Sequence, residues 1–152
     1  MEQISQWIDD HKDDMIQTLQ KWLSHPSLKG EAQENAPFGK EVRLALDAAL
    51  ADGQAMGFQV RDHEGYAGDI SLGPAGVDPL GILTHLDIVP VGDGWTVDPF
   101  AGVTDDEKVI GRGASDDKGP AVAALYAMKA VLESGKPLRR EVRLILGCDE
   151  ES

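Results

Sequence analysis

The chain has 152 residues, the length of one domain, and 41% of them are hydrophobic. That share is sufficient for a buried core and argues against intrinsic disorder. The formal net charge is −13, from 27 acidic and 14 basic residues. It argues against a nucleic-acid or anionic-membrane surface, because both need clustered positive charge, and it suits a protein that holds cations.

Cysteine count and the N-terminal segment narrow the cellular context. Cys148 is the single cysteine, so no internal disulfide can form. The first ten residues are acidic and amphipathic and lack the basic start and apolar run of a secretory signal. No apolar stretch approaches the roughly 20 residues that span a bilayer. We therefore expect a cytoplasmic protein.

Three segments carry apolar side chains at spacings of three and four, which predicts amphipathic helices. These helices are expected over residues 2–24, 39–56 and 117–134. Pro26 ends the first helix, Gly57 caps the end of the second, and Ser115 or Asp116 caps the start of the third.

Short alternating or apolar runs between the helices predict strands. The strands are expected over residues 58–62, 66–72, 80–84, 108–110 and 141–147. The first two form a hairpin, and the third is a buried strand that delivers His85. Residues 88–105 are too rich in Gly, Pro and Asp for a regular element, and ordered loops of this length are often functional.

Strands and helices alternate in the second half, which favours an α/β fold with a mostly parallel sheet and helices on both faces. In such sheets, ligand sites gather beyond the carboxyl ends of the strands. His85 and Glu150 each follow a strand, and Asp116 lies on a glycine-rich turn that opens a helix. We expect these three segments to face one crevice.

His85 and Asp87 are separated by one residue, so in an extended chain both side chains point to the same side. A neutral imidazole is a good ligand for zinc, cobalt or manganese. A nearby carboxylate can accept the other ring N–H and fix the tautomer. The alternative is a strand-end histidine that is hydrogen-bonded to its neighbour, and alone this pair favours that alternative.

Asp116 and Asp117 lie among Gly111, Gly113 and Gly119. The helix dipole alone is enough to favour acidic residues at a helix start. In that interpretation Lys118, the next residue, is solvated. The dipole does not explain the surrounding glycines, which permit sharp turns and close backbone approach. A carboxylate with two oxygens can instead bridge two metal ions about 3.5–4 Å apart.

Glu150 and Glu151 are adjacent, so they point in different directions. Two like charges are costly together unless a cation compensates them. One carboxylate can bind metal while the other takes a proton from a metal-bound water; the alternative is a solvated acidic turn. Three acidic sites in order, each at the end of an element, together favour a metal site.

Taken in order, these segments resemble the M20 family of metallopeptidases. The resemblance rests on the segments 85–87, 111–120 and 149–152, on the loop motifs within 87–100, and on Pro26-Ser27. The Asp-Asp-Lys-Gly-Pro form is most similar to the PepV-type dipeptidases, which include Xaa-His dipeptidases. The resemblance to the family covers nearly the whole chain.

The resemblance implies an enzyme with two zinc ions, or with cobalt or manganese in some members, that hydrolyses a dipeptide or a small N-acyl amino acid. It implies that His85 and Glu151 bind metal and that Asp116 bridges the two ions. It makes Glu150 the general base and lets Asp87 support His85 from behind.

The resemblance also implies parts that lie outside this chain. The family supplies a further acidic ligand, a final histidine and a lid domain beyond the position of Ser152. Residues 1–152 would then be a truncated N-terminal portion of a zinc-peptidase-like catalytic domain, inactive by itself. The alternatives are another amide hydrolase of the family, such as a deacylase or carboxypeptidase, and a non-catalytic cation-binding domain. The sequence does not indicate an oligomeric state.

Overall fold

A computed structural model describes residues 2–76, 78–105 and 107–152. The helices are α1 (Glu2–Asp10), α2 (Lys12–Leu23), α3 (Lys40–Ala55) and α4 (Lys118–Glu133). The strands are β1 (Gln59–His63), β2 (Ala67–Leu72), β3 (Leu80–His85), β4 (Val103–Thr104), β5 (Val109–Ile110) and β6 (Val142–Gly147). In the described ranges, no helix is both long and apolar enough to cross a membrane.

The main sheet has the strand order β1-β2-β6-β3. The α/β prediction is confirmed, but the sheet is mixed rather than mostly parallel. β1 and β2 are antiparallel, as the short turn between them requires, and β2 and β6 are also antiparallel. Only the β3–β6 pair of this sheet is parallel among the described residues, because α4 forms the crossover between these two strands.

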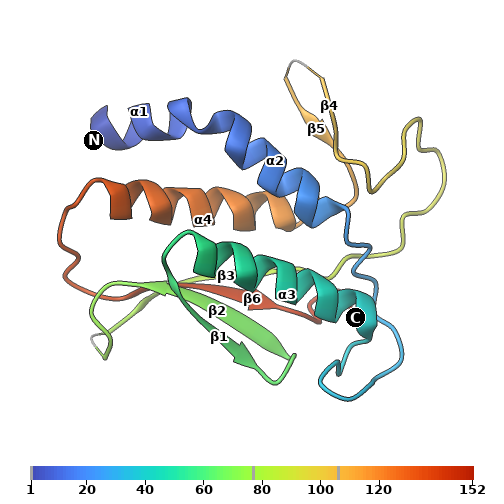
Figure 1. Ribbon diagram of the computed structural model, residues 1–152. Coiled ribbons are helices and arrows are strands. Elements are labelled where there is room, and N and C mark those ends of the chain that lie inside the picture. The colour runs from blue at the N-terminus through green and yellow to red at the C-terminus, as the bar shows by residue number, and fades with distance from the viewer. Residues whose placement is uncertain (1, 77, 106) are drawn as a thin grey trace.

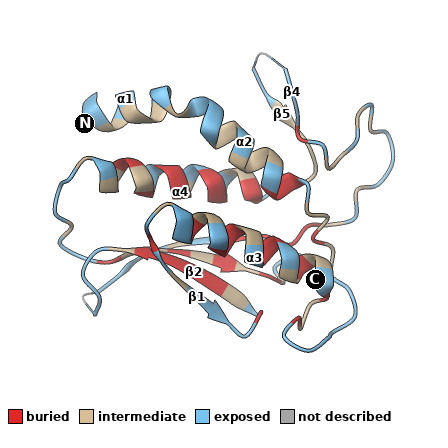
Figure 2. Ribbon diagram, viewed as in Figure 1, coloured by how far each residue is buried: buried red, intermediate tan, exposed pale blue. Residues whose placement is uncertain are grey.

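The helices cover one face of the sheet instead of the two that the sequence predicts (Figure 1). α3 packs on β1 and β2, α4 packs on β3 and β6, and α1 and α2 lie over α4. The core forms between these layers, where buried positions line the inner sides of α3 and α4 (Figure 2). Leu46, Ile70, Leu125 and Leu144 are fully buried there and pack the sheet against both helices.

β3 is an edge strand, so the prediction that it is buried holds for one face only. Thr84 and His85 are buried at its carboxyl end, whereas Leu83 is 79% exposed on the uncovered face. Apolar runs do not distinguish a central strand from an edge strand, since both bury their inner side chains.

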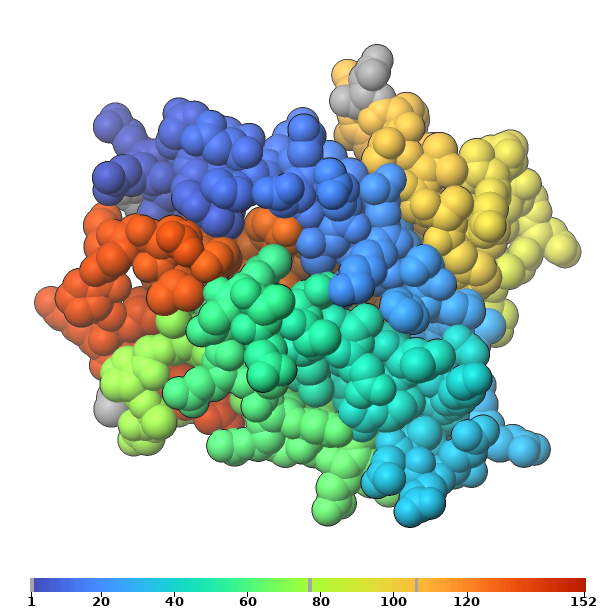
Figure 3. Space-filling model, in the orientation of Figure 1, coloured from blue at the N-terminus to red at the C-terminus, as the bar shows by residue number. Residues whose placement is uncertain are grey.

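The predicted first helix is divided in two at His11. The ring Nδ1 of His11 interacts with the Trp7 carbonyl at 2.8 Å, and the two rings stack with centroids 3.9 Å apart. The loop after β3 returns along α2, where Gln20 Nε2 donates to the Gly102 carbonyl at 2.9 Å. Figure 3 shows residues 88–105 and 107–110 gathered beside the end of α2.

Candidate metal centre

His85 ends β3 and is 7% exposed, with a different partner at each ring nitrogen. Its Nδ1 lies 3.1 Å from the carbonyl oxygen of Asp87, and its Nε2 lies 3.0 Å from Asp116 Oδ1. A carbonyl oxygen can only accept, so Nδ1 carries the proton. In the neutral ring, Nε2 then carries a lone pair that faces the carboxylate of Asp116. Two acceptors at this distance need a shared proton or a cation between them.

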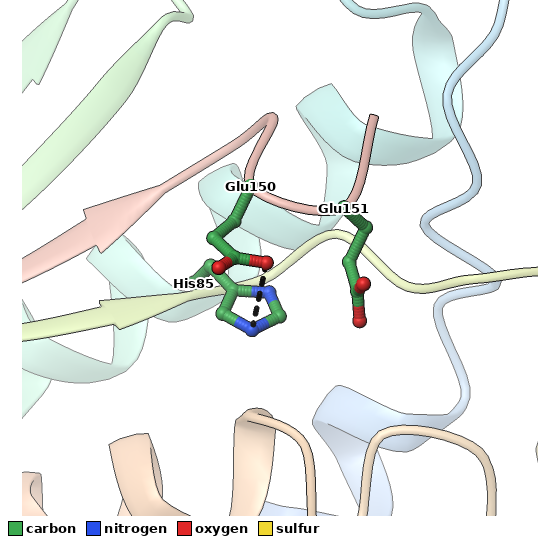
Figure 4. A group of neighbouring side chains, drawn as sticks. All are labelled: His85, Glu150 and Glu151. Carbon is green, nitrogen blue, oxygen red and sulfur yellow. Dashed lines mark ion pairs between the residues drawn. The ribbon is translucent and has the colours of Figure 1, made fainter.

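Glu150 and Glu151 follow β6 and complete the group (Figure 4). Glu150 Oε2 lies 3.9 Å from His85 Nε2. One ligand atom from each of His85, Glu150 and Glu151 lies within 4.8 Å of the other two. Strand β6 is paired with β3 in parallel, so their carboxyl ends meet at the same edge of the sheet.

Asp87 is 2% exposed and connects these two strand ends. Its Oδ2 accepts a hydrogen bond from the backbone N–H of Glu151 at 3.0 Å. Its Oδ1 lies 3.4 Å from His85 Nδ1 and has no hydrogen-bond partner among the described residues. The carboxylate therefore stands directly behind the imidazole, where it favours positive charge on the ring or on a group bound to it.

The turn before α4 brings Asp116 to the histidine from a third direction. Asp117 is the N-cap position, not Ser115 or Asp116, and no side-chain cap is formed within the described part of the chain. Instead, Asp117 Oδ2 accepts from the backbone N–H of His85 at 3.2 Å. Asp117 thus binds the strand that carries the histidine, and Asp116 is left 73% exposed at the side chain, free to bind a ligand.

A cleft of about 670 Å³ opens over this group. It is lined by Phe38, Tyr66, Leu83, Thr84, His85, Asp116, Asp117, Gly147, Cys148, Asp149 and Glu150. Glu151 faces a smaller neighbouring hollow that it shares with Asp87. The cleft is therefore lined by both acidic side chains, Asp116 and Glu150 among them, and aromatic or apolar ones such as Phe38 and Leu83. A hollow of similar size between α2 and α4 contains none of the described site residues.

The electrostatics of the group favour a bound cation. Burial alone would lower the pKa of His85, but its hydrogen bond to Asp116 and its contacts with Asp87 outweigh burial and raise that pKa above 6.5. The same carboxylates that favour a proton on Nε2 would favour a metal ion in its place.

Lys118 is a residue of this region that the sequence did not reveal. It is fully buried, not solvated, and its Nζ donates to the backbone carbonyl of His25 at 2.7 Å. Burial lowers its pKa to about 7, and the charge of Asp87 opposes that shift. Cys148 is also buried.

Comparisons with known proteins match nearly the whole of this chain or its second half. Residues 81–152 match peptidase family M20/M25/M40. YtjP of Bacillus subtilis (strain 168), provisionally named a dipeptidase, is 43% identical over 143 residues, which are 93% of this chain and 31% of the relative. A provisionally named dipeptidase of Staphylococcus epidermidis is 41% identical over 145 residues, 94% of this chain and 31% of the relative. The chain thus spans about a third of the length of these relatives.

Solved structures share the fold. Human carnosine dipeptidase 1 superposes with a TM-score of 0.77 at 27% identity, over 99% of this chain and 35% of that one. The dipeptidase Dug1p of Saccharomyces cerevisiae superposes with a TM-score of 0.84 at 21% identity, over the same shares of each chain. The acidic group at the strand ends, the family match over residues 81–152 and these relatives agree: the chain is similar to members of peptidase family M20/M25/M40.

Proposed function

We propose that residues 1–152 form the N-terminal portion of the catalytic domain of a metal-dependent dipeptidase. The observation that carries this proposal is the environment of His85 Nε2, which faces carboxylates from two other segments, Asp116 before α4 and Glu150 after β6. The names of the relatives support the substrate class, because YtjP and the human and yeast proteins are described as dipeptidases.

The side chains present fit a pair of divalent ions. One imidazole nitrogen and several carboxylate oxygens suit zinc, cobalt or manganese, and the Asp87 carbonyl at His85 Nδ1 favours the tautomer that leaves Nε2 for a metal. We assign His85 and Glu151 as ligands and Asp116 as the ligand shared by both ions. When bound, such ions polarise the scissile carbonyl and lower the pKa of water.

Glu150 is assigned as the general base. Its side chain is 65% exposed and lines the cleft beside His85, so its carboxylate can reach both a water molecule and a substrate amide. Glu150 takes the proton of the attacking water and then gives it to the leaving amine. Asp87 accepts the Glu151 backbone N–H and stands behind the imidazole, so it orients two ligands without touching substrate.

Glu150→Gln tests this assignment in the protein at its natural length. Glutamine keeps the size of the side chain but cannot take up a proton at neutral pH, so we expect unchanged metal content and a loss of about 100-fold or more in kcat. Glu133→Gln on the outer end of α4 is the matched control, since Glu133 pairs only with Lys129 among its described neighbours. Normal hydrolysis by Glu150→Gln would remove Glu150 from the role of base.

The same assay separates the proposed substrate class from its nearest alternative. A panel of dipeptides and N-acyl amino acids, measured side by side, should give the higher kcat/KM for the dipeptides. Higher values for the N-acyl compounds would make the protein a deacylase and would leave the assignment of the metal ligands intact.

A further inference from the structure

Lys118 lies outside the residues assigned to metal or substrate, yet it is fully buried directly behind them. It is the first residue of α4, two positions after Asp116. Its side chain runs under the turn, where a Cβ added at Gly113 would lie 3.4 Å from Lys118 Cδ. Burying a lysine lowers stability unless its ammonium group is hydrogen-bonded or paired, because burial disfavours the charged form.

The partner of the ammonium is the loop after α2. Lys118 Nζ donates to the His25 carbonyl at 2.7 Å, and the Ser27 backbone N–H donates to the same oxygen at 2.8 Å. The two donors meet at one acceptor, so the lysine fixes the conformation of residues 25–27. Ser27 is also fully buried, and this short turn is therefore held from inside the fold.

The turn formed by residues 25–27 also holds the backbone on both sides of Asp87. Ser27 Oγ donates to the Leu86 carbonyl at 2.6 Å, and the Ile88 backbone N–H donates to the Ser27 carbonyl at 3.2 Å. Asp87 lies between these two bonds and makes the contacts already described to His85 and to the Glu151 backbone. Hydrogen bonds, joined by the short backbone segments 25–27 and 86–88, therefore connect the start of α4 with the ends of β3 and β6.

We propose that Lys118 and Ser27 are positioning residues, which form a buried brace that fixes Asp87 and thereby aligns His85 with Glu151. The brace places three segments, each carrying an assigned metal ligand, in one register before any ion is bound. The hydrogen bonds of the brace do not depend on metal. The inference rests on the proposed function only because that function makes His85 and Glu151 metal ligands.

The test compares Lys118→Met with Lys129→Met in the protein at its natural length. Both residues lie on α4, but Lys129 pairs with Glu133 on the surface. Loss of partners behind metal ligands typically lowers metal affinity about 10- to 100-fold, and we expect that loss of zinc affinity for Lys118→Met alone. Lys118→Met leaves the buried carboxylate of Asp87 without a nearby cation, so we expect the thermal midpoint to fall as well. A purely structural role would lower the midpoint but leave zinc affinity unchanged at a temperature where the variant is fully folded.

Backbone amide exchange in the metal-free protein provides the second readout. The brace predicts faster exchange at Ile88 and Glu151 in both Lys118→Met and Ser27→Ala, with no change in Lys129→Met. If either variant fails to fold, the other decides. If the unaltered protein binds zinc and the variants match it in both amide exchange and zinc affinity, the brace is overturned. Faster exchange in a protein that binds no zinc would leave the brace standing and refute the proposed function.

Discussion

Gly119→Ala is the substitution whose consequence the structure specifies most closely. Gly119 is the second residue of α4, and a Cβ built on it would lie 2.0 Å from the carbonyl oxygen of Ala114 and 3.1 Å from its carbon. Both atoms belong to the backbone of the turn that carries Asp116, so no side-chain rotation can relieve the contact.

The displacement that follows is large on the scale of the site. Ordinary contacts begin at 3.4 Å, so the turn and the first turn of α4 must separate by about 1.4 Å. Such overpacking typically costs about 1–3 kcal/mol of unfolding free energy. A misplacement of about 1 Å in a catalytic group can reduce the rate about 100-fold, and Asp116 is three residues from the substitution.

Denaturant unfolding, zinc titration and dipeptide hydrolysis measure the two effects separately. Gly81→Ala is the matched control, because its Cβ would lie 3.8 Å from Ile145 Cδ1, an ordinary contact in β3. We expect Gly119→Ala to lose zinc affinity and about 100-fold in rate while Gly81→Ala keeps both. A Gly119→Ala protein with normal zinc affinity and normal rate would show that the turn does not position Asp116.

Two further predictions concern the core. Leu144→Ala, at a fully buried position of β6, should lower the unfolding free energy by about 2–5 kcal/mol in denaturant titrations; Leu83→Ala, at a position that is 79% exposed, should change it by about 0.5 kcal/mol or less. Burial raises the pKa of Cys148 to about 12, so iodoacetamide should not alkylate the folded protein at pH 8 but should alkylate it in denaturant, as followed by mass spectrometry. Because the unfolded thiol ionises at lower pH than the folded one, Cys148 lowers the stability as pH rises from 9 towards 12. Fast alkylation of the folded protein would contradict this account of the core. A loss of stability in Leu83→Ala as large as that in Leu144→Ala would also contradict it.

Much of the site could be predicted because its residues follow the ends of regular elements. The apolar runs before His85 and before Glu150 predicted strands, and the periodicity after Asp117 predicted a helix. Once strands and helix were placed, their ends were expected to converge, and the structure brings His85, Glu150 and Glu151 together.

The parts that could not be predicted depend on long-range packing. The amphipathic pattern of residues 2–24 continues across His11, so the break there left no signal in the apolar spacing. Strand direction depends on which strands become neighbours, and β6 lies between β2 and β3 although it is the last in sequence. Lysine is usually exposed, so composition gave no indication that Lys118 is buried against the His25 carbonyl.

The most direct test of the central claim is an anomalous-scattering crystal structure of the zinc-loaded protein at its natural length, measured at the zinc absorption edge. The account predicts a peak at bonding distance, about 2.0–2.1 Å, from His85 Nε2, and two peaks that share Asp116. A zinc-loaded crystal whose anomalous peaks lie away from His85, Asp116 and Glu151 would contradict it.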